Sequence, residues 1–197
     1  MLAILADFLT KTDKGYYCRY GNFYIDAMAP VAVNLISHAH GDHATAGHEL
    51  WYASKATIAF MWNKYRKLDA QRIREVDFDQ PFEVNGVTIE FITAGHILGS
   101  AQILMQYQGV RYLYTGDYKL QLDATCELIR MVKADVLITE STFADPLVKH
   151  PDPVQEILKL KDCNSNIMLG CYSLGKAQRL TALINAHLPD RTVLTHH

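Results

Sequence analysis

Seven consecutive residues, SHAHGDH at 37–43, constrain this chain more than any other feature. They carry three histidines and an aspartate, and they directly follow a run at 32–36, apolar except for Asn34, that predicts a short buried strand. Imidazoles two residues apart at a strand end can be turned toward one metal ion, and the adjacent Asp42 and His43 can address a second. Gly41 allows the tight backbone that such a loop needs. We therefore expect a metal centre at the end of this strand.

The pattern around this loop predicts an α/β protein with mixed sheets. Strands dominate the first two thirds of the chain, and strands alternate with helices afterwards. The expected elements are a hairpin at 16–26, a helix at 56–67, strands at 84–93, 102–108, 110–115 and 135–139, a helix opened by Asp152 and Pro153, a strand at 166–172, a helix capped by Ser173, and a strand beginning at 192.

The composition is that of an ordinary globular chain with room for one full domain. It has 197 residues, 49% of them hydrophobic, and a formal net charge of -2. That charge provides no global field for a polyanion, so a nucleic-acid substrate would need a local cationic groove.

The apolar N-terminus is interrupted by Asp7 and has no basic residues before it, so we expect no signal peptide, no membrane span and a cytoplasmic location. The four cysteines form no Cys-x-x-Cys pair and are expected to be reduced thiols in the core.

The segment SHAHGDH resembles the metal-binding motif of the metallo-β-lactamase superfamily, and four later segments narrow the resemblance. TAGHILGSAQ at 93–102, YTGDY at 114–118, ITEST at 138–142 and SLGKAQRL at 173–180 are similar, in the same order, to the β-CASP branch, whose members act on nucleic acids. The opening stretch 15–26 resembles short bacterial DNA-ligase-associated exonucleases or relatives of messenger-RNA 3′-end processing factors. The resemblance implies an αββα sandwich at 1–145 and the start of a β-CASP-like segment at 146–197.

The resemblance also implies roles for individual residues. His38, His40 and His96 would bind one zinc ion, Asp42 and His43 a second, and Asp117 would bridge them, with manganese as the alternative metal. Without the resemblance, His96 is an even choice between ligand and structural residue, and Asp117 is more typical of a turn.

Three further positions carry weaker expectations. Glu140 would assist the site by hydrogen bonding or proton transfer, although a carboxylate at a strand end is common. Ser173, Gly175 and Lys176 lie at a helix N-terminus that could hold a phosphate, although capping alone explains Ser173. His48, His150 and His187 are expected to be structural or solvated.

β-CASP proteins continue beyond the point that corresponds to His197 and supply a further histidine to the second metal. We therefore expect this chain to be an N-terminal portion that binds its second metal weakly, cleaves poorly by itself and exposes apolar surface that favours a homodimer. His196 or His197 is a less favoured substitute ligand.

The expected reaction is hydrolysis of DNA or RNA phosphodiester bonds by a di-zinc-activated water, with exonuclease action favoured and DNA ligase or helicase as partners by resemblance. Two alternatives stay open: a thioester, lactone or β-lactam hydrolase on the same fold, and a non-catalytic nucleic-acid-binding subunit. The first alternative does not explain why the segments at 138–142 and 173–180 resemble the β-CASP branch.

Overall fold

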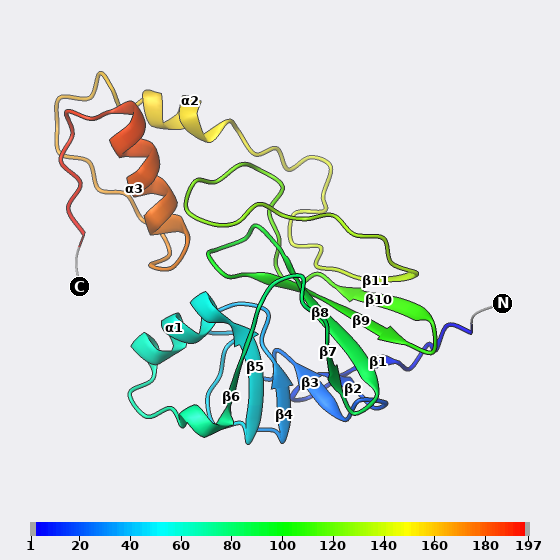
Figure 1. The fold of residues 1–197 in the computed structure, drawn as a ribbon. Helices are drawn as coiled ribbons and strands as arrows, with labels where there is room; N and C mark the ends of the chain where they lie inside the picture. The colour runs from blue at the N-terminus through cyan, green and yellow to red at the C-terminus, as the bar shows by residue number, and fades with distance from the viewer. Residues whose placement is uncertain (1–2, 196–197) are drawn as a thin grey trace. The chain divides into compact units, whose positions relative to one another are not determined.

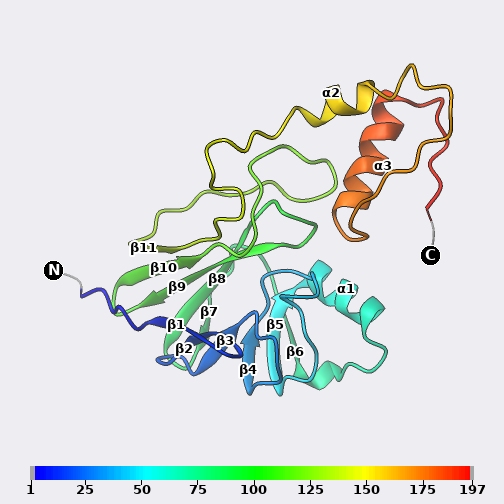
Figure 2. The same ribbon diagram turned by 180° about the vertical axis from the view of Figure 1, so that it is seen from behind.

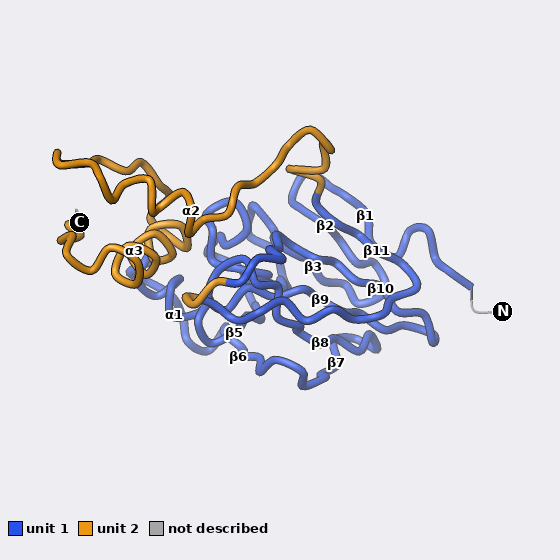
Figure 3. The backbone as a smooth tube through the Cα atoms, turned by 90° about the horizontal axis from the view of Figure 1, so that it is seen from above, with its two compact units in different colours: residues 1–122, 126–140 blue, residues 123–125, 141–197 orange. Residues whose placement is uncertain are grey.

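The computed structural model describes residues 3–195, so His196 and His197 lie outside the described residues. The chain divides into two compact units, residues 1–122 with 126–140 and residues 123–125 with 141–197 (Figure 3). The first unit contains all the strands found in the described part of the chain. The elements, labelled in Figure 1, are β1 (Leu9–Thr12), β2 (Gly15–Cys18), β3 (Phe23–Ile25), β4 (Val33–Leu35), β5 (Leu50–Ser54), α1 (Lys55–Lys64), the 3-10 turn η1 (Ala70–Arg72), β6 (Ile73–Val76), β7 (Phe82–Val84), β8 (Val87–Thr93), β9 (Ala101–Tyr107), β10 (Val110–Tyr114), β11 (Val136–Ile138), α2 (Pro153–Leu158) and α3 (Lys176–His187).

Two mixed sheets build the first unit, as the sequence predicts. One has the order β1-β2-β3-β4-β5-β6 and the other the order β11-β10-β9-β8-β7. Strands β3 to β6 pair in parallel and β11 pairs in parallel with β10, whereas the hairpins pair antiparallel. Figures 1 and 2 show the two sheets from opposite sides.

The main core lies between the two sheets. Phe23, Ile25 and Leu35 from the first sheet pack with Phe91 and Ile103 from the second, all of them fully buried. Strand β9 also buries Leu104 on its other face, which explains why it is a largely apolar run.

Each sheet also buries its outer face. Trp51 and Ala53 of β5 pack against Ile58 and Met61 of α1. On the second sheet, Leu104 and Leu113 pack with the irregular segment that holds Val132 and Ala134. A helix therefore covers the first sheet, and an irregular segment covers the second within this unit.

Local turn chemistry explains several predicted elements. Residues 16–26 form the expected hairpin, with Tyr16 opposite Ile25. Ser54 caps α1 by accepting a hydrogen bond from the Thr57 backbone N–H. Asp152 caps α2 and Pro153 is its first residue, as predicted.

Four predictions of local structure were wrong. The expected single strand at 84–93 is a hairpin of β7 and β8, because Asn85 and Gly86 both adopt positive φ angles, 48° and 82°, as a tight turn requires. The segments 166–172 and 192–195 form no strand, since no neighbouring strand in the described second unit pairs with them. Gly175, with φ of 85°, is the N-cap residue of α3 in place of Ser173.

The cysteines are only partly in the core. Cys18 is fully buried, but Cys171 is exposed and Cys126 and Cys163 are half-buried. The expectation of four core thiols was therefore wrong for three of them. No helix in the described range 3–195 combines the length and the apolar character that a membrane crossing requires.

Candidate metal centre

The loop that follows β4 presents its histidines from a tight turn. The backbone N–H groups of His43 and Ala44 both donate to the carbonyl of His40, at 3.1 and 2.8 Å. The loop is tied to the second sheet, because the Ala101 N–H donates to the Ser37 carbonyl at 2.8 Å. This closure brings the ends of β4, β8 and β10 to one edge of the sandwich.

Three histidines and one aspartate converge at this edge. His38 Nε2 and His96 Nε2 lie 3.0 and 3.1 Å from His40 Nδ1. Asp117 Oδ2 lies 3.9 Å from His38 Nε2 and 3.7 Å from His96 Nε2. One ligand atom from each of the four residues lies within 4.8 Å of the others. The structure thus brings together the four residues that the sequence proposes for one ion.

A second group of donors lies on the other side of Asp117. His43 Nε2 is 3.6 Å from Asp117 Oδ1 and 3.7 Å from Asp42 Oδ2. Asp117 therefore directs one carboxylate oxygen to each group of side chains. Asp42 is largely exposed, so this second group opens toward solvent.

Sequence reasoning missed Asp26, which organises both groups from behind. Its Oδ1 accepts a hydrogen bond from the Ser37 backbone N–H at 2.7 Å. Its Oδ2 accepts from Ser37 Oγ at 2.7 Å, from His43 Nδ1 at 2.9 Å and from Tyr114 Oη at 3.1 Å. Asp26 is 6% exposed and has a positive φ of 50° at the end of β3. Nothing local in the sequence distinguishes this residue from the many aspartates that end strands.

This network fixes which ring nitrogens face the centre. The Ser37 hydroxyl hydrogen points to Asp26, so Ser37 Oγ accepts from His38 Nδ1, 3.0 Å away. The lone pair of His38 Nε2 is then directed at His40 and His96. His43 Nδ1 donates to Asp26 in the same way, so the proton that His43 must lose to bind a metal is the one on Nε2.

The histidines of the two groups differ in the direction in which their surroundings shift the pKa. Burial, with the nearby His43, lowers the pKa of His38 well below its usual value. Burial and the neighbouring His40 lower the pKa of His96 to about 4. Burial also lowers the pKa of His43, but the hydrogen bond to Asp26 and the charges of Asp26 and Asp117 raise it to about 9. Burial raises the pKa of the Asp117 carboxyl, and the positive charge of His43 partly offsets this rise.

These residues fit a metal ion by the chemistry of their donors. His38 and His96 are held as neutral imidazoles, the form that a metal requires, and their acceptor nitrogens converge with a carboxylate. Nitrogen and oxygen donors of this kind suit zinc, and also suit manganese where carboxylates predominate. The cluster is compatible with metal binding.

Glu140 lies beside the second group of donors. Its Oε1 accepts a hydrogen bond from the Tyr118 backbone N–H at 3.1 Å. A hollow of about 200 Å³ is lined by Tyr16, His43, Tyr114, Gly116, Asp117, Ile138, Thr139 and Glu140. Glu140 therefore faces the same space as His43 and Asp117.

The structure places Ser173, Gly175 and Lys176 in the second unit. Ser173 makes no capping hydrogen bond to α3; instead Gln178 Oε1 accepts from the Gly175 N–H at 2.7 Å and its Nε2 donates to the Ser173 carbonyl at 3.0 Å. Lys176 Nζ lies 5.3 Å from the centre of the Tyr172 ring. The helix N-terminus is thus capped by Gln178.

The other three histidines within residues 3–195 lie outside the cluster. His48 is buried, and its Nδ1 accepts from the Val31 backbone N–H at 3.3 Å, so it is a structural residue as expected. His150 and His187 are exposed.

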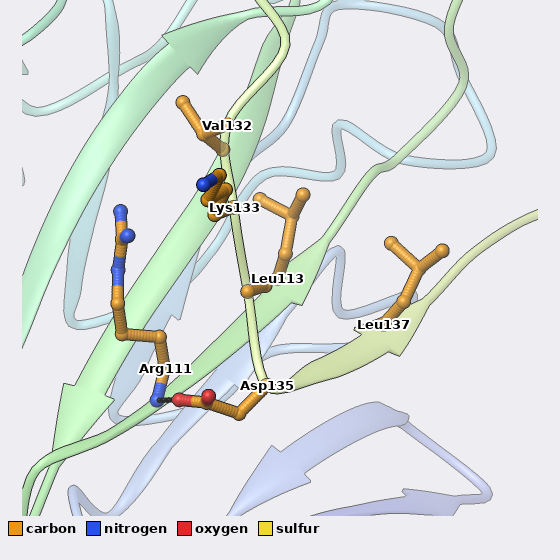
Figure 4. A pocket seen from close by; sticks show the side chains of 7 residues that line it. Arg111, Leu113, Val132, Lys133, Asp135 and Leu137 are labelled. Atoms are coloured by element: carbon orange, nitrogen blue, oxygen red, sulfur yellow. Dashed lines mark hydrogen bonds between the residues drawn. The ribbon is translucent and has the colours of Figure 1, made fainter.

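A larger hollow of about 490 Å³ lies over β10 and β11, at the opposite ends of the strands from the histidines. Figure 4 shows its side chains, with the Arg111 backbone N–H donating to the Asp135 carboxylate at 2.8 Å. Its lining consists of Arg111, Leu113, Val132, Lys133, Ala134, Asp135 and Leu137. This mixture holds no cluster of metal ligands in the described range, so we assign it no role in the chemistry.

Three known proteins are similar in sequence to this chain over 58% to 91% of its length. A "Probable DNA ligase" of Opitutus terrae is 35% identical over 192 residues, which are 91% of this chain and 18% of the ligase. The "Cleavage and polyadenylation specificity factor subunit 3-I" of Arabidopsis thaliana is 28% identical over 208 residues, covering 85% of this chain and 30% of the factor. "Endoribonuclease ysh1" of Aspergillus fumigatus is 32% identical over 123 residues, 58% of this chain and 14% of the endoribonuclease. The chain therefore spans less than a third of these relatives.

A solved structure supports the fold independently. A protein of unknown function from Enterococcus faecalis aligns with a TM-score of 0.54 and 18% identity, over 78% of this chain and 44% of that one. The family model described as "Beta-lactamase superfamily domain" matches residues 21–197. The chain therefore belongs to the metallo-β-lactamase superfamily, and its similarity to the cleavage factor and the endoribonuclease agrees with the β-CASP branch.

Proposed function

We propose that the chain carries the catalytic centre of a metal-dependent nuclease that hydrolyses phosphodiester bonds of DNA or RNA, with exonuclease action favoured. The observation that carries this proposal is the convergence of His38, His40, His96 and Asp117 within 4.8 Å. Relatives named as an endoribonuclease and as a cleavage and polyadenylation factor support nucleic acid as the substrate.

Two zinc ions, with manganese as the alternative, would supply the activated water and the charge stabilisation. His38, His40 and His96 would hold the first ion, Asp42 and His43 the second, and Asp117 would bridge them. The chain's own contribution is orientation, because Asp26 fixes the tautomers of His38, through Ser37, and of His43.

Glu140 would act in the hollow that it shares with His43 and Asp117. A carboxylate there can accept a proton during attack or donate one to the leaving oxygen. The phosphate site at Ser173, Gly175 and Lys176 stays a prediction, as do a cytoplasmic location, a homodimer, association with a DNA ligase or helicase, and the domain boundary after residue 145.

The test uses the full-length protein, with zinc or manganese, on single-stranded DNA and RNA labelled at the 5′ or the 3′ end. We expect metal-dependent release of mononucleotides from one end, whereas internal fragments would replace the exonuclease assignment with an endonuclease. Hydrolysis of a thioester, lactone or β-lactam without strand cleavage would support the alternative hydrolase. Metal loading without any hydrolysis would support a binding subunit.

A further inference from the structure

The helix α1 and the residues just after it concentrate positive charge on a chain that is acidic overall. Residues 55–68 contain no aspartate or glutamate, although the whole chain has a net charge of -2. Lys64, Arg66 and Lys67 lie within four positions and are all exposed. No ion pair joins any of these three to a carboxylate in the range 3–195. The segment is a local cationic surface, which we call the 64–67 ridge.

The 64–67 ridge begins beside the histidine loop. A Cβ atom built on Gly41 would lie 3.2 Å from Lys64 Nζ, so the ammonium group is next to the backbone between His40 and Asp42. Tyr65 fixes this approach, because its hydroxyl donates to the Ala44 carbonyl at 2.9 Å. Lys64 Nζ lies 4.8 Å from the centre of the Tyr65 ring, a cation–π distance that steadies the lysine.

Helix capping explains only part of this charge. A lysine in the last turn of a helix is favoured by the helix dipole, which accounts for Lys64. The helix ends there, and Tyr65 is already extended, with φ of -111° and ψ of 112°. Arg66 and Lys67 therefore lie beyond the reach of that effect.

We propose that Lys64, Arg66 and Lys67 bind backbone phosphates of the nucleic-acid strand that leads to the metal centre. The proposal rests on the proposed function and adds positioning residues to it. Lysine and arginine neutralise phosphates without regard to sequence, and each contact releases a counterion.

The test compares two variants of the whole protein that lose one lysine and one arginine each. The test variant is Lys64→Gln with Arg66→Gln; the control is Lys133→Gln with Arg111→Gln, which line the hollow at the far ends of the strands. Binding of a fluorescent single-stranded oligonucleotide is measured by anisotropy in chelator, over a series of salt concentrations. We expect the slope of log affinity against log salt to fall by about 1.4 in the test variant, about 0.7 for each phosphate contact on a single strand, and to be unchanged in the control.

A second readout separates this proposal from the proposed function. With metal present, the test variant should have a KM for the oligonucleotide that is several-fold higher than that of the unmodified protein, and a nearly unchanged kcat. The single variant Lys64→Arg, which keeps the positive charge, should have the KM of the unmodified protein. Hydrolysis of bis(4-nitrophenyl) phosphate, which has no neighbouring backbone phosphates for the ridge to bind, should be unaffected. If the test variant has the same salt slope as the unmodified protein, or if the slope of the control falls equally, the 64–67 ridge does not bind phosphates. Failure to hydrolyse either substrate would overturn the nuclease assignment, while the binding series would still decide the ridge.

Discussion

Asp26 Oδ2 lies 2.9 Å from Nδ1 of His43 and holds this ring with its other nitrogen facing Asp117. We expect Asp26→Asn to lower zinc affinity about 10- to 100-fold, the usual effect of losing a partner behind a metal ligand. The amide has one acceptor oxygen where the carboxylate serves four donors. Calorimetric titration of zinc into metal-free protein measures the change. Asp7→Asn, which removes an exposed pair with Arg19, should leave zinc affinity unaltered, and an equal loss in both variants would refute the positioning role of Asp26.

Asp117 is the residue that both groups of metal-ligand side chains share. Asp117→Asn should abolish metal-dependent strand cleavage, because a bridging carboxylate would be lost, while the protein stays folded. Turnover is measured at equal metal loading, with circular dichroism as the check on folding. Unchanged turnover under those conditions would reject the bridging role.

The part of the site that the sequence could predict is the part carried by contiguous residues. His38, His40, Asp42 and His43 lie within six positions, so a loop alone brings them together. His96 and Asp117 follow β8 and β10, and their placement at the same edge needed the family resemblance as well as the strand pattern. Asp26 could not be found, since its role arises from four donors on Ser37 and His43 of the histidine loop and on Tyr114 of β10, which only the fold brings to it.

The fold was predictable to a similar extent. Short apolar runs identified most strands of the second sheet, but the Asn85 turn divided one of them. The segment 166–172 has β-prone residues yet no described partner strand, and propensity alone does not make a strand without a neighbour. The first sheet was harder to predict, because β5 and β6 mix polar with apolar residues and the two central residues of β6 are exposed.

Gly99 joins the His96 loop to α1 and should tolerate no side chain. Its carbonyl accepts from Ser54 Oγ at 2.6 Å, and a Cβ there would lie 2.6 Å from the Ala56 Cβ, with φ at 78°. We expect Gly99→Ala to cost about 2–4 kcal/mol of unfolding free energy, the sum of a positive-φ penalty and overpacking. Gly86→Ala, at φ of 82° with open space around it, should cost only about 1 kcal/mol. Urea unfolding of both variants gives the comparison; equal losses would mean that the contact with α1 is unimportant.

His48 should make stability depend on pH. Burial lowers the pKa of His48 below its usual value of 6.5, and its Nδ1 must stay unprotonated to accept from the Val31 N–H. A lowered histidine pKa means that its stabilising contribution is complete above 6.5 and is lost as the pH falls from there toward the folded-state pKa. The slope is at most about 1.4 kcal/mol per pH unit for one proton. Urea unfolding between pH 5 and pH 8 should show a flatter profile for His48→Asn than for the unmodified protein, and identical profiles would exclude His48 as the source.

The most direct test of the metal-dependent nuclease is a zinc titration of strand cleavage. The whole protein is stripped with a chelator, and hydrolysis of an end-labelled oligonucleotide is followed as zinc is returned, with bound metal quantified in each sample. We predict no cleavage by the stripped protein, recovery in proportion to bound zinc, and no recovery in His40→Ala, whose ring nitrogen lies 3.0 and 3.1 Å from those of His38 and His96. Cleavage that survives complete metal removal, or full recovery in His40→Ala, would contradict the account.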